Sequence, residues 1–285
     1  MPDQPVIDLA INTATTRRQW SLAQAIDGYA RAGITAIGPW RDEVCEMGPE
    51  RAARRISDAG MKVTGLCRAG ILSALDEAQF RAALDDNRRA IDEAAALGAQ
   101  VVVLVAGGLP SATVELTAVR QRVAEGIAAL IPDAKAAGVR LGIEPLHPIY
   151  AADRCVINTL DQALDLCDSL DPDGENGLGV IVDTYHVWWD PGLAEAIDRA
   201  APRTLGYHIN DWMSPQADPL NDRGMMGDGA IDLVGITRLV HSADITLTPE
   251  VELFSERWWA EDPDVVVKTC IDRWGEISAR VDTSA

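Results

Sequence analysis

Basic residues, phenylalanine and long apolar runs are all scarce in this sequence. Its 285 residues hold 25 Lys and Arg against 44 Asp and Glu, which gives a formal net charge of −19 at pH 7. Because nucleic-acid-binding proteins usually present basic patches, this balance argues against a nucleic-acid partner. The sequence has neither a run of about 18 apolar residues nor a charged-then-apolar leader, so we expect no membrane partner and a cytoplasmic location.

Cysteine spacing excludes a common class of metal site. The chain has five cysteines, an odd number, and none of them forms a CxxC pair. We expect reduced thiols, four of which fill core space or helix faces. The five are Cys45, Cys67, Cys155, Cys167 and Cys270.

The sequence does contain a regular alternation of short runs rich in Val, Ile, Leu and Thr with longer alanine-rich segments of helical period. The short runs start roughly 26 to 41 residues apart, which is the length of a strand, a crossover helix and two loops. Eight of these runs are predicted strands, at Val6–Ile11, Ile34–Gly38, Lys62–Cys67, Gln100–Val105, Arg140–Glu144, Leu178–Asp183, Thr204–Ile209 and Thr248–Phe254.

Eight such units predict an α/β fold, a single (β/α)8 TIM barrel, with one catalytic domain over residues 1–285, because barrels of this kind need about 250 residues. Glycines such as Gly98 and Gly138 end the predicted helices, where a left-handed cap is cheap only for glycine. An open doubly wound sheet is the alternative. It would place a GxGxxG motif after the first strand, and the sequence INTATTR found there does not match.

Four metal-capable side chains stand at the ends of the last four predicted strands. They are Glu144, Asp183, His208 and Glu252. Strand ends meet at the C-terminal rim of a barrel, so we expect these groups to lie close together. Three carboxylates and one imidazole favour Mn²⁺, with Mg²⁺, Co²⁺ or Zn²⁺ as alternatives, and zinc usually takes more nitrogen or sulfur ligands.

The alternative for each residue alone is a structural role. A single Asp or Glu at a strand end is more often a helix cap or an ion-pair partner, but burying three carboxylates together without a cation would be costly. Glu250 shares a strand face with Glu252, because strand side chains alternate with period two. We choose Glu252 because it lies nearer the end of the strand, and Glu250 is expected one layer below or in its place.

The motifs EPLHP, VDTYH, HINDW, GDGAID and VELFS resemble those of the xylose-isomerase-like barrel family of sugar isomerases and epimerases. The resemblance covers nearly the whole chain and is most specific in its second half. It implies one divalent metal, commonly Mn²⁺, on the four residues named above. It also implies that His186 touches the substrate, that Arg223 holds a substrate oxygen, and that the chain forms a homo-oligomer.

One position departs from the ketohexose 3-epimerases of that family. Those enzymes typically carry PLNR and a second acidic residue after the metal-binding glutamate, where this chain has His147 and Tyr150. Histidine titrates near neutral pH, so His147 is a candidate catalytic base. The alternative is a loop histidine bonded to the backbone. Related enzymes that cleave C-glycosides use a histidine close to this glutamate, and the pattern here resembles theirs.

Tryptophan is abundant relative to the other aromatic residues, with eight Trp against two Phe and four Tyr. Seven of the eight follow predicted strands, so we expect indoles at the rim of the barrel. Trp40, Trp188 and Trp212 are predicted to line the substrate site, and a subunit interface is the alternative. Arg41 and Arg68 also follow strands and would make the pocket less acidic than the whole chain, although each is expected to pair with a local carboxylate such as Asp42 or Glu43.

These observations predict a metal-dependent isomerase or epimerase that acts on a sugar. It would remove a proton α to the carbonyl of a keto-sugar through a metal-stabilised enediolate, with Glu144, Glu252 and His147 as candidate catalytic residues. One alternative is a lyase that cleaves 3-oxo-C-glycosides together with a small second subunit, with His147 as base. Another is a non-catalytic sugar-binding barrel. A three-metal nuclease would need more than the four histidines present.

Overall fold

The computed structural model describes residues 7–282, so Val6, the first residue of the first predicted strand, lies outside it, as do the ends of the predicted domain. Its main sheet is parallel and has the order β3-β2-β1-β11-β8-β7-β6-β5-β4. The strands are β1 (Ile7–Asn12), β2 (Ile34–Gly38), β3 (Lys62–Val63), β4 (Leu66–Gly70), β5 (Val101–Val105), β6 (Arg140–Ile143), β7 (Leu178–Asp183), β8 (Thr204–Ile209) and β11 (Glu250–Val251).

The two ends of the sheet, β3 and β4, meet within the segment predicted as the third strand. The predicted strand Lys62–Cys67 is divided into β3 and β4, which stand at the two ends of the sheet order and are joined by Thr64 and Gly65. A parallel bridge from Trp40 to Cys67 connects the end of β2 to β4. The predicted (β/α)8 barrel is therefore confirmed as a nearly closed barrel of parallel strands.

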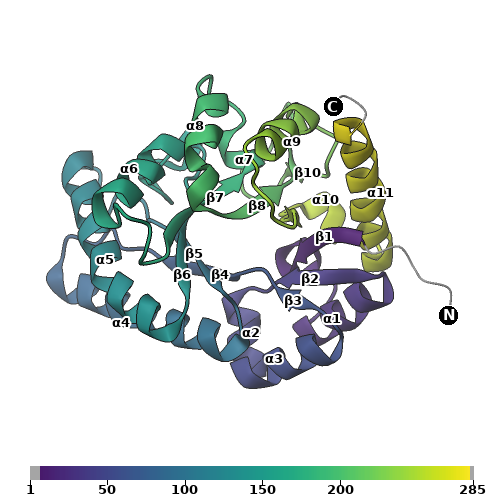
Figure 1. Cartoon of the computed structure of the whole chain (residues 1–285), viewed down its shortest axis with the longest axis horizontal. Coiled ribbons are helices and arrows are strands. Elements are labelled where there is room, and N and C mark those ends of the chain that lie inside the picture. The colour runs from purple at the N-terminus through teal and green to yellow at the C-terminus, as the bar shows by residue number, and fades with distance from the viewer. Residues whose placement is uncertain (1–6, 283–285) are drawn as a thin grey trace.

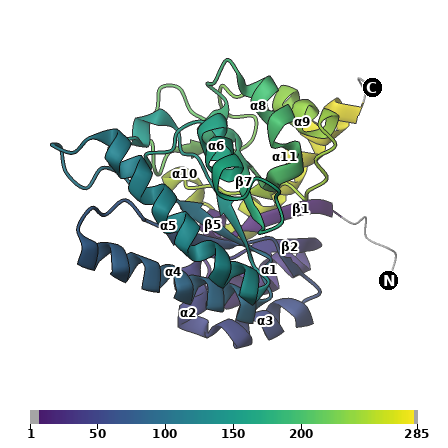
Figure 2. The same ribbon diagram turned by 60° about the vertical axis from the view of Figure 1, so that its left-hand side comes forward.

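Helices surround the barrel, and α4 and α5, the two that follow β4 and β5, lie side by side (Figures 1 and 2). Within the described range, every helix is too short or too polar to cross a membrane. The remaining elements include a small hairpin, β9 (Asp211–Trp212) with β10 (Arg223–Gly224). The helices are α1 (Leu22–Arg31), α2 (Arg41–Met47), α3 (Pro49–Asp58), α4 (Glu77–Leu97), α5 (Leu116–Ala137), α6 (Leu160–Leu170), α7 (Thr184–Val187), α8 (Leu193–Ala200), α9 (Leu233–Ser242), α10 (Glu256–Trp259) and α11 (Pro263–Asp282), with short 3-10 turns η1 (Thr13–Thr16), η2 (Pro148–Tyr150) and η3 (Ala201–Arg203).

Apolar side chains form a large core between strands and helices and a small cluster that includes Val101, Val103 and Ile181. Gly98 and Gly138 end α4 and α5 with φ of 81° and 70°, as the sequence predicted for left-handed caps. All five cysteines are free, and all but Cys45 are buried. These packed layers hold the strand ends in fixed positions.

The last strand is shorter than predicted. Only Glu250 and Val251 pair in β11, whereas the sequence predicted Thr248–Phe254. After Val251, the backbone N–H of Glu252 still donates to the carbonyl of Ile209 at 3.4 Å, whereas that of Leu253 donates to the hydroxyl of Thr15 at 3.2 Å in place of a strand partner. The residue after β11 is thus placed at the rim of the barrel.

Candidate metal centre and its cavity

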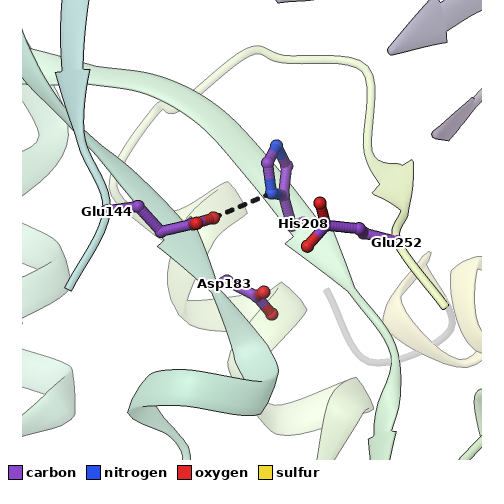
Figure 3. A group of neighbouring side chains, drawn as sticks. All are labelled: Glu144, Asp183, His208 and Glu252. Atoms are coloured by element: carbon purple, nitrogen blue, oxygen red, sulfur yellow. Dashed lines mark ion pairs between the residues drawn. The ribbon is translucent and has the colours of Figure 1, made fainter. Parts of the chain in front are cut away.

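The side chains of Glu144, Asp183, His208 and Glu252 point toward one another at the C-terminal ends of the strands (Figure 3). Glu144 follows β6, Asp183 ends β7, His208 lies in β8 and Glu252 follows β11. The β7–β8 register pairs Asp183 with His208 directly. Each of the four residues offers one ligand atom, and these four atoms all lie within 4.8 Å of one another. All four residues are buried.

Two atoms of this group lack the partners that buried polar atoms need. Nδ1 of His208 lies 3.1 Å from Oε1 of Glu144. Neither atom makes a hydrogen bond of good geometry within residues 7–282. Burying a polar atom without a partner is costly, and a cation between these atoms would satisfy both. The residues present therefore fit a divalent metal.

Glu250 lies on the far side of His208. Its Oε1 is 3.8 Å from Nε2 of His208 and accepts a 2.6 Å hydrogen bond from Nδ2 of Asn12. Its Oε2 accepts a hydrogen bond from the hydroxyl of Thr64. A carboxylate placed on the second ring nitrogen orients a metal-binding histidine. The geometry thus gives Glu250 a supporting position and leaves Glu252 among the four convergent groups.

Arg223, from β10, supplies positive charge to the carboxylates. Its Nη1 lies 3.3 Å from Oδ2 of Asp183 and 3.2 Å from Oε2 of Glu252. Asn210, which the sequence analysis did not identify, donates through Nδ2 to the carbonyl of Glu252 at 3.0 Å. Its place in the HINDW motif, directly after β8, is the sequence signal that could have found it. These contacts fix the carboxylates before any ion binds.

Burial and neighbouring charges shift the pKa values of this group. Burial alone lowers the pKa of His208, but the charges of Glu250 and Glu144 outweigh it and raise that pKa to about 10. Burial, and then the charge of Glu144, raises the pKa of Glu252. Before a metal binds, His208 therefore holds a proton near neutral pH, and a metal must displace a proton to take its place.

His186 has a defined tautomer. Its Nδ1 accepts the backbone N–H of His147 at 3.2 Å, so in the neutral ring the proton is on Nε2. Burial, and then the charge of Arg223, lowers the pKa of His186 well below its usual value, which keeps the ring neutral. Nε2 lies 3.6 Å from Oδ2 of Asp183. His186 thus presents a hydrogen-bond donor beside the convergent carboxylates.

A cavity of about 580 Å³ opens next to this group. Glu144 and Glu252 line it, together with His186 and Arg223. Trp40 adds an apolar wall. The volume lies in the usual range for small-molecule sites.

Comparison with known proteins identifies the family. The family model of the xylose isomerase-like TIM barrel matches residues 26–270. The chain belongs to this family. Among curated proteins, none matches the sequence of the chain.

Solved structures agree with this assignment. A protein from Sinorhizobium meliloti 1021 is 52% identical, with a TM-score of 0.92, over 95% of this chain and 98% of that one. An IolI protein solved with a bound zinc atom is 19% identical, with a TM-score of 0.81, over 96% of this chain and 98% of that one. An L-ribulose 3-epimerase is 21% identical, with a TM-score of 0.76, over 96% of this chain and 94% of that one. The last two likenesses show the fold alone.

In this member of the xylose isomerase-like family, His147 does not line the cavity. Its Nδ1 accepts the backbone N–H of Ile149 at 3.2 Å, and its half-buried ring packs on Trp212 with centroids 4.5 Å apart. Burial lowers its pKa to about 4. The geometry matches the alternative of a loop histidine bonded to the backbone, and we do not assign His147 the role of base.

The predicted aromatic wall is present only in part. Trp40 lines the cavity, but Trp188 and Trp212 do not. Those two indoles pack on each other, with centroids 5.7 Å apart, and Trp212 also packs on Tyr185. Sequence position located them after strands, but it does not fix the direction in which a loop side chain points.

Two arginines of the cavity wall, Arg17 and Arg18, are the second feature that the sequence analysis missed. Arg17 and Arg18 follow η1 directly and line the cavity, and Arg68, which lies within β4, lines it as well. Arg41, in contrast, pairs with carboxylates as expected, but these are Asp86, 2.7 Å away, and Glu93 of α4, and not the local Asp42 or Glu43. A loop arginine has no periodic signal, so only its folded position shows that it reaches the cavity.

Proposed function

We propose that the chain is a divalent-metal-dependent isomerase or epimerase that removes a proton α to the carbonyl of a keto-sugar. The observation that carries the proposal is the convergence of Glu144, Asp183, His208 and Glu252 beside a cavity of small-molecule size. Mn²⁺ is the favoured ion, because three of the four groups are carboxylates. Structural neighbours named for sugar epimerisation and for bound zinc support this class.

The bound ion would supply a Lewis acid that offsets negative charge developing on the substrate oxygen. The protein supplies the proton carriers. Glu144 and Glu252 enter the cavity from β6 and β11, and β7 and β8 lie between these strands in the barrel. The two carboxylates therefore approach a substrate from different directions. One would take the proton and the other would return it on the second face or at the neighbouring carbon.

Two neighbouring groups would orient the sugar. His186 offers its Nε2–H, and Arg223 offers guanidinium N–H groups, at the same end of the cavity. Both are buried, so their hydrogen bonds to sugar oxygens would form in a region with little competing water.

The lyase alternative drew its support from His147 as a base. Because that ring lies outside the cavity wall and its Nδ1 is bonded to the backbone, we propose the isomerase or epimerase in its place. A non-catalytic barrel would not need carboxylates buried close to one another on the wall of a cavity.

Solvent deuterium exchange tests the proposal. The protein with Mn²⁺ is incubated in D₂O with free ketohexoses and, separately, with 3-oxo-glycosides, and mass spectrometry measures label on the carbon next to the carbonyl. We expect metal-dependent exchange that falls by roughly 100-fold or more in Glu144→Gln and Glu252→Gln. Glu276→Gln, the same change on the exposed surface of α11, is the matched control. No exchange from any keto-sugar would contradict the proposal.

A further inference from the structure

The wall of the cavity is rich in arginine although the chain is strongly acidic. Arginines at five positions line it, against carboxylates at three, and the formal net charge of the chain is −19. Two of those carboxylates, Glu144 and Glu252, belong to the candidate metal centre. The four arginines other than Arg223 form no ion pair with these two carboxylates within residues 7–282, and we call the part of the wall that they form the outer part of the cavity. Its arginines are Arg17, Arg18, Arg68 and Arg154.

These arginines differ in how they are neutralised. Arg17 lies 2.8 Å from Asp42, and Arg18 pairs with Glu256. Arg154 lies 3.9 Å from the neighbouring Asp153. Arg68 has no carboxylate at ion-pair distance within residues 7–282. A surface arginine without a partner is ordinary, but Arg68 is only partly exposed and lies on the wall of the cavity.

Arg68 and Arg17 both contact the ring of Trp40. Its guanidinium carbon is 5.9 Å from the centroid of the Trp40 ring, and that of Arg17 is 5.1 Å from the same centroid. Of these two guanidinium groups, only that of Arg17 has a carboxylate at ion-pair distance within residues 7–282, so one positive charge beside the indole is not neutralised. An oxyanion beside Arg68 would neutralise this charge, and a guanidinium matches a carboxylate or phosphate through two parallel hydrogen bonds.

We propose that the substrate of this enzyme carries an anionic oxyacid group, a carboxylate or a phosphate, which Arg68 binds in the outer part of the cavity. The keto end of the same molecule would then lie against Glu144 and Glu252. This inference rests on the proposed function for its sugar portion. The anion site itself depends only on Arg68 and its neighbours.

Calorimetric titration of the Mn²⁺-loaded protein tests the inference with three ligands that differ only at carbon 6. They are a ketohexose, its 6-phosphate and the corresponding 6-carboxylate. We expect at least one anionic ligand to bind roughly 10-fold or more tightly than the neutral sugar, the scale of one charge-assisted hydrogen-bonded contact. The tighter of the two anionic ligands identifies the group as phosphate or carboxylate.

Two variants assign the preference to Arg68. Arg68→Gln should remove most of the anionic advantage, and Arg68→Lys should keep part of it, because lysine retains the charge without the fork geometry. Arg89→Gln removes the same charge from the exposed face of α4 and should preserve the advantage. The melting temperature of each variant shows whether it is folded.

Equal affinity for all three sugars, or an advantage that survives in Arg68→Gln, would overturn the inference while leaving the proposed function intact. Inorganic phosphate provides a separate measurement. If no keto-sugar exchanges deuterium, but inorganic phosphate binds the original protein and Arg89→Gln and not Arg68→Gln, the proposed function fails and the anion site stands.

Discussion

Replacing Glu250 or Glu252 by glutamine should give two different losses of metal affinity. Glu252 is one of the four convergent groups, whereas Glu250 lies 3.8 Å from Nε2 of His208 and is held by Asn12 and Thr64. A group that orients a metal-binding histidine typically contributes 10- to 100-fold in affinity. Glu250→Gln should therefore weaken binding by about that factor, and Glu252→Gln should weaken it further because a ligand is lost.

The same factor predicts a change in thermal stability. With saturating metal, a 10- to 100-fold larger dissociation constant lowers the free energy of unfolding of the metal-bound protein by about 1.4 to 2.7 kcal/mol. For a domain of this size, that corresponds to a fall in melting temperature of roughly 3 to 10 °C. Metal titration by calorimetry and melting with and without Mn²⁺ measure both quantities. If Glu252→Gln binds metal normally and Glu250→Gln does not, the assignment of the two glutamates is reversed.

Three further predictions concern protonation and assembly. The pKa of His208 is raised to about 10, and its proton must leave before the ring can bind a metal, so Mn²⁺ binding should release at least one proton near pH 7. Calorimetry in two buffers of different ionisation enthalpy measures this release. No release would contradict the assignment of His208 as a ligand. The pKa of His147 is lowered to about 4, so between about pH 6.5 and 4 the unfolded chain binds a proton that the folded protein does not, and stability falls as pH falls. His147→Gln should therefore reduce the loss of melting temperature in that window and leave deuterium exchange within about 10-fold of the original protein. A larger fall in exchange would restore His147 as the base. The family suggests a homo-oligomer, and light scattering that finds a fully active monomer would refute this.

Strand positions could be predicted because buried strands have a simple sequence pattern. Ile34–Gly38, Leu178–Asp183 and Thr204–Ile209 have the same bounds in the sequence prediction and in β2, β7 and β8. Period two also placed Glu250 and Glu252 on one face. The convergence of Glu144, Asp183, His208 and Glu252 followed from those strand ends, since a barrel brings them to one rim.

The contacts of loop side chains, and those of Arg68 within β4, could not be predicted in the same way. His147, Trp188 and Trp212 were expected at the substrate, but they pack in an aromatic cluster outside the cavity wall. Arg68 was expected to pair with a carboxylate and instead faces the cavity without one at ion-pair distance in the described part of the chain. The direction of a loop side chain depends on the tertiary contacts of its neighbours, and no local periodicity encodes them.

Anomalous diffraction from crystals of the protein grown with Mn²⁺, measured at the manganese edge, tests the central claim most directly. We expect one strong peak bound by Glu144, Asp183, His208 and Glu252, with Glu250 hydrogen-bonded to the far nitrogen of His208. A peak bound by Glu250 in place of Glu252, or no peak among these four side chains, would contradict it.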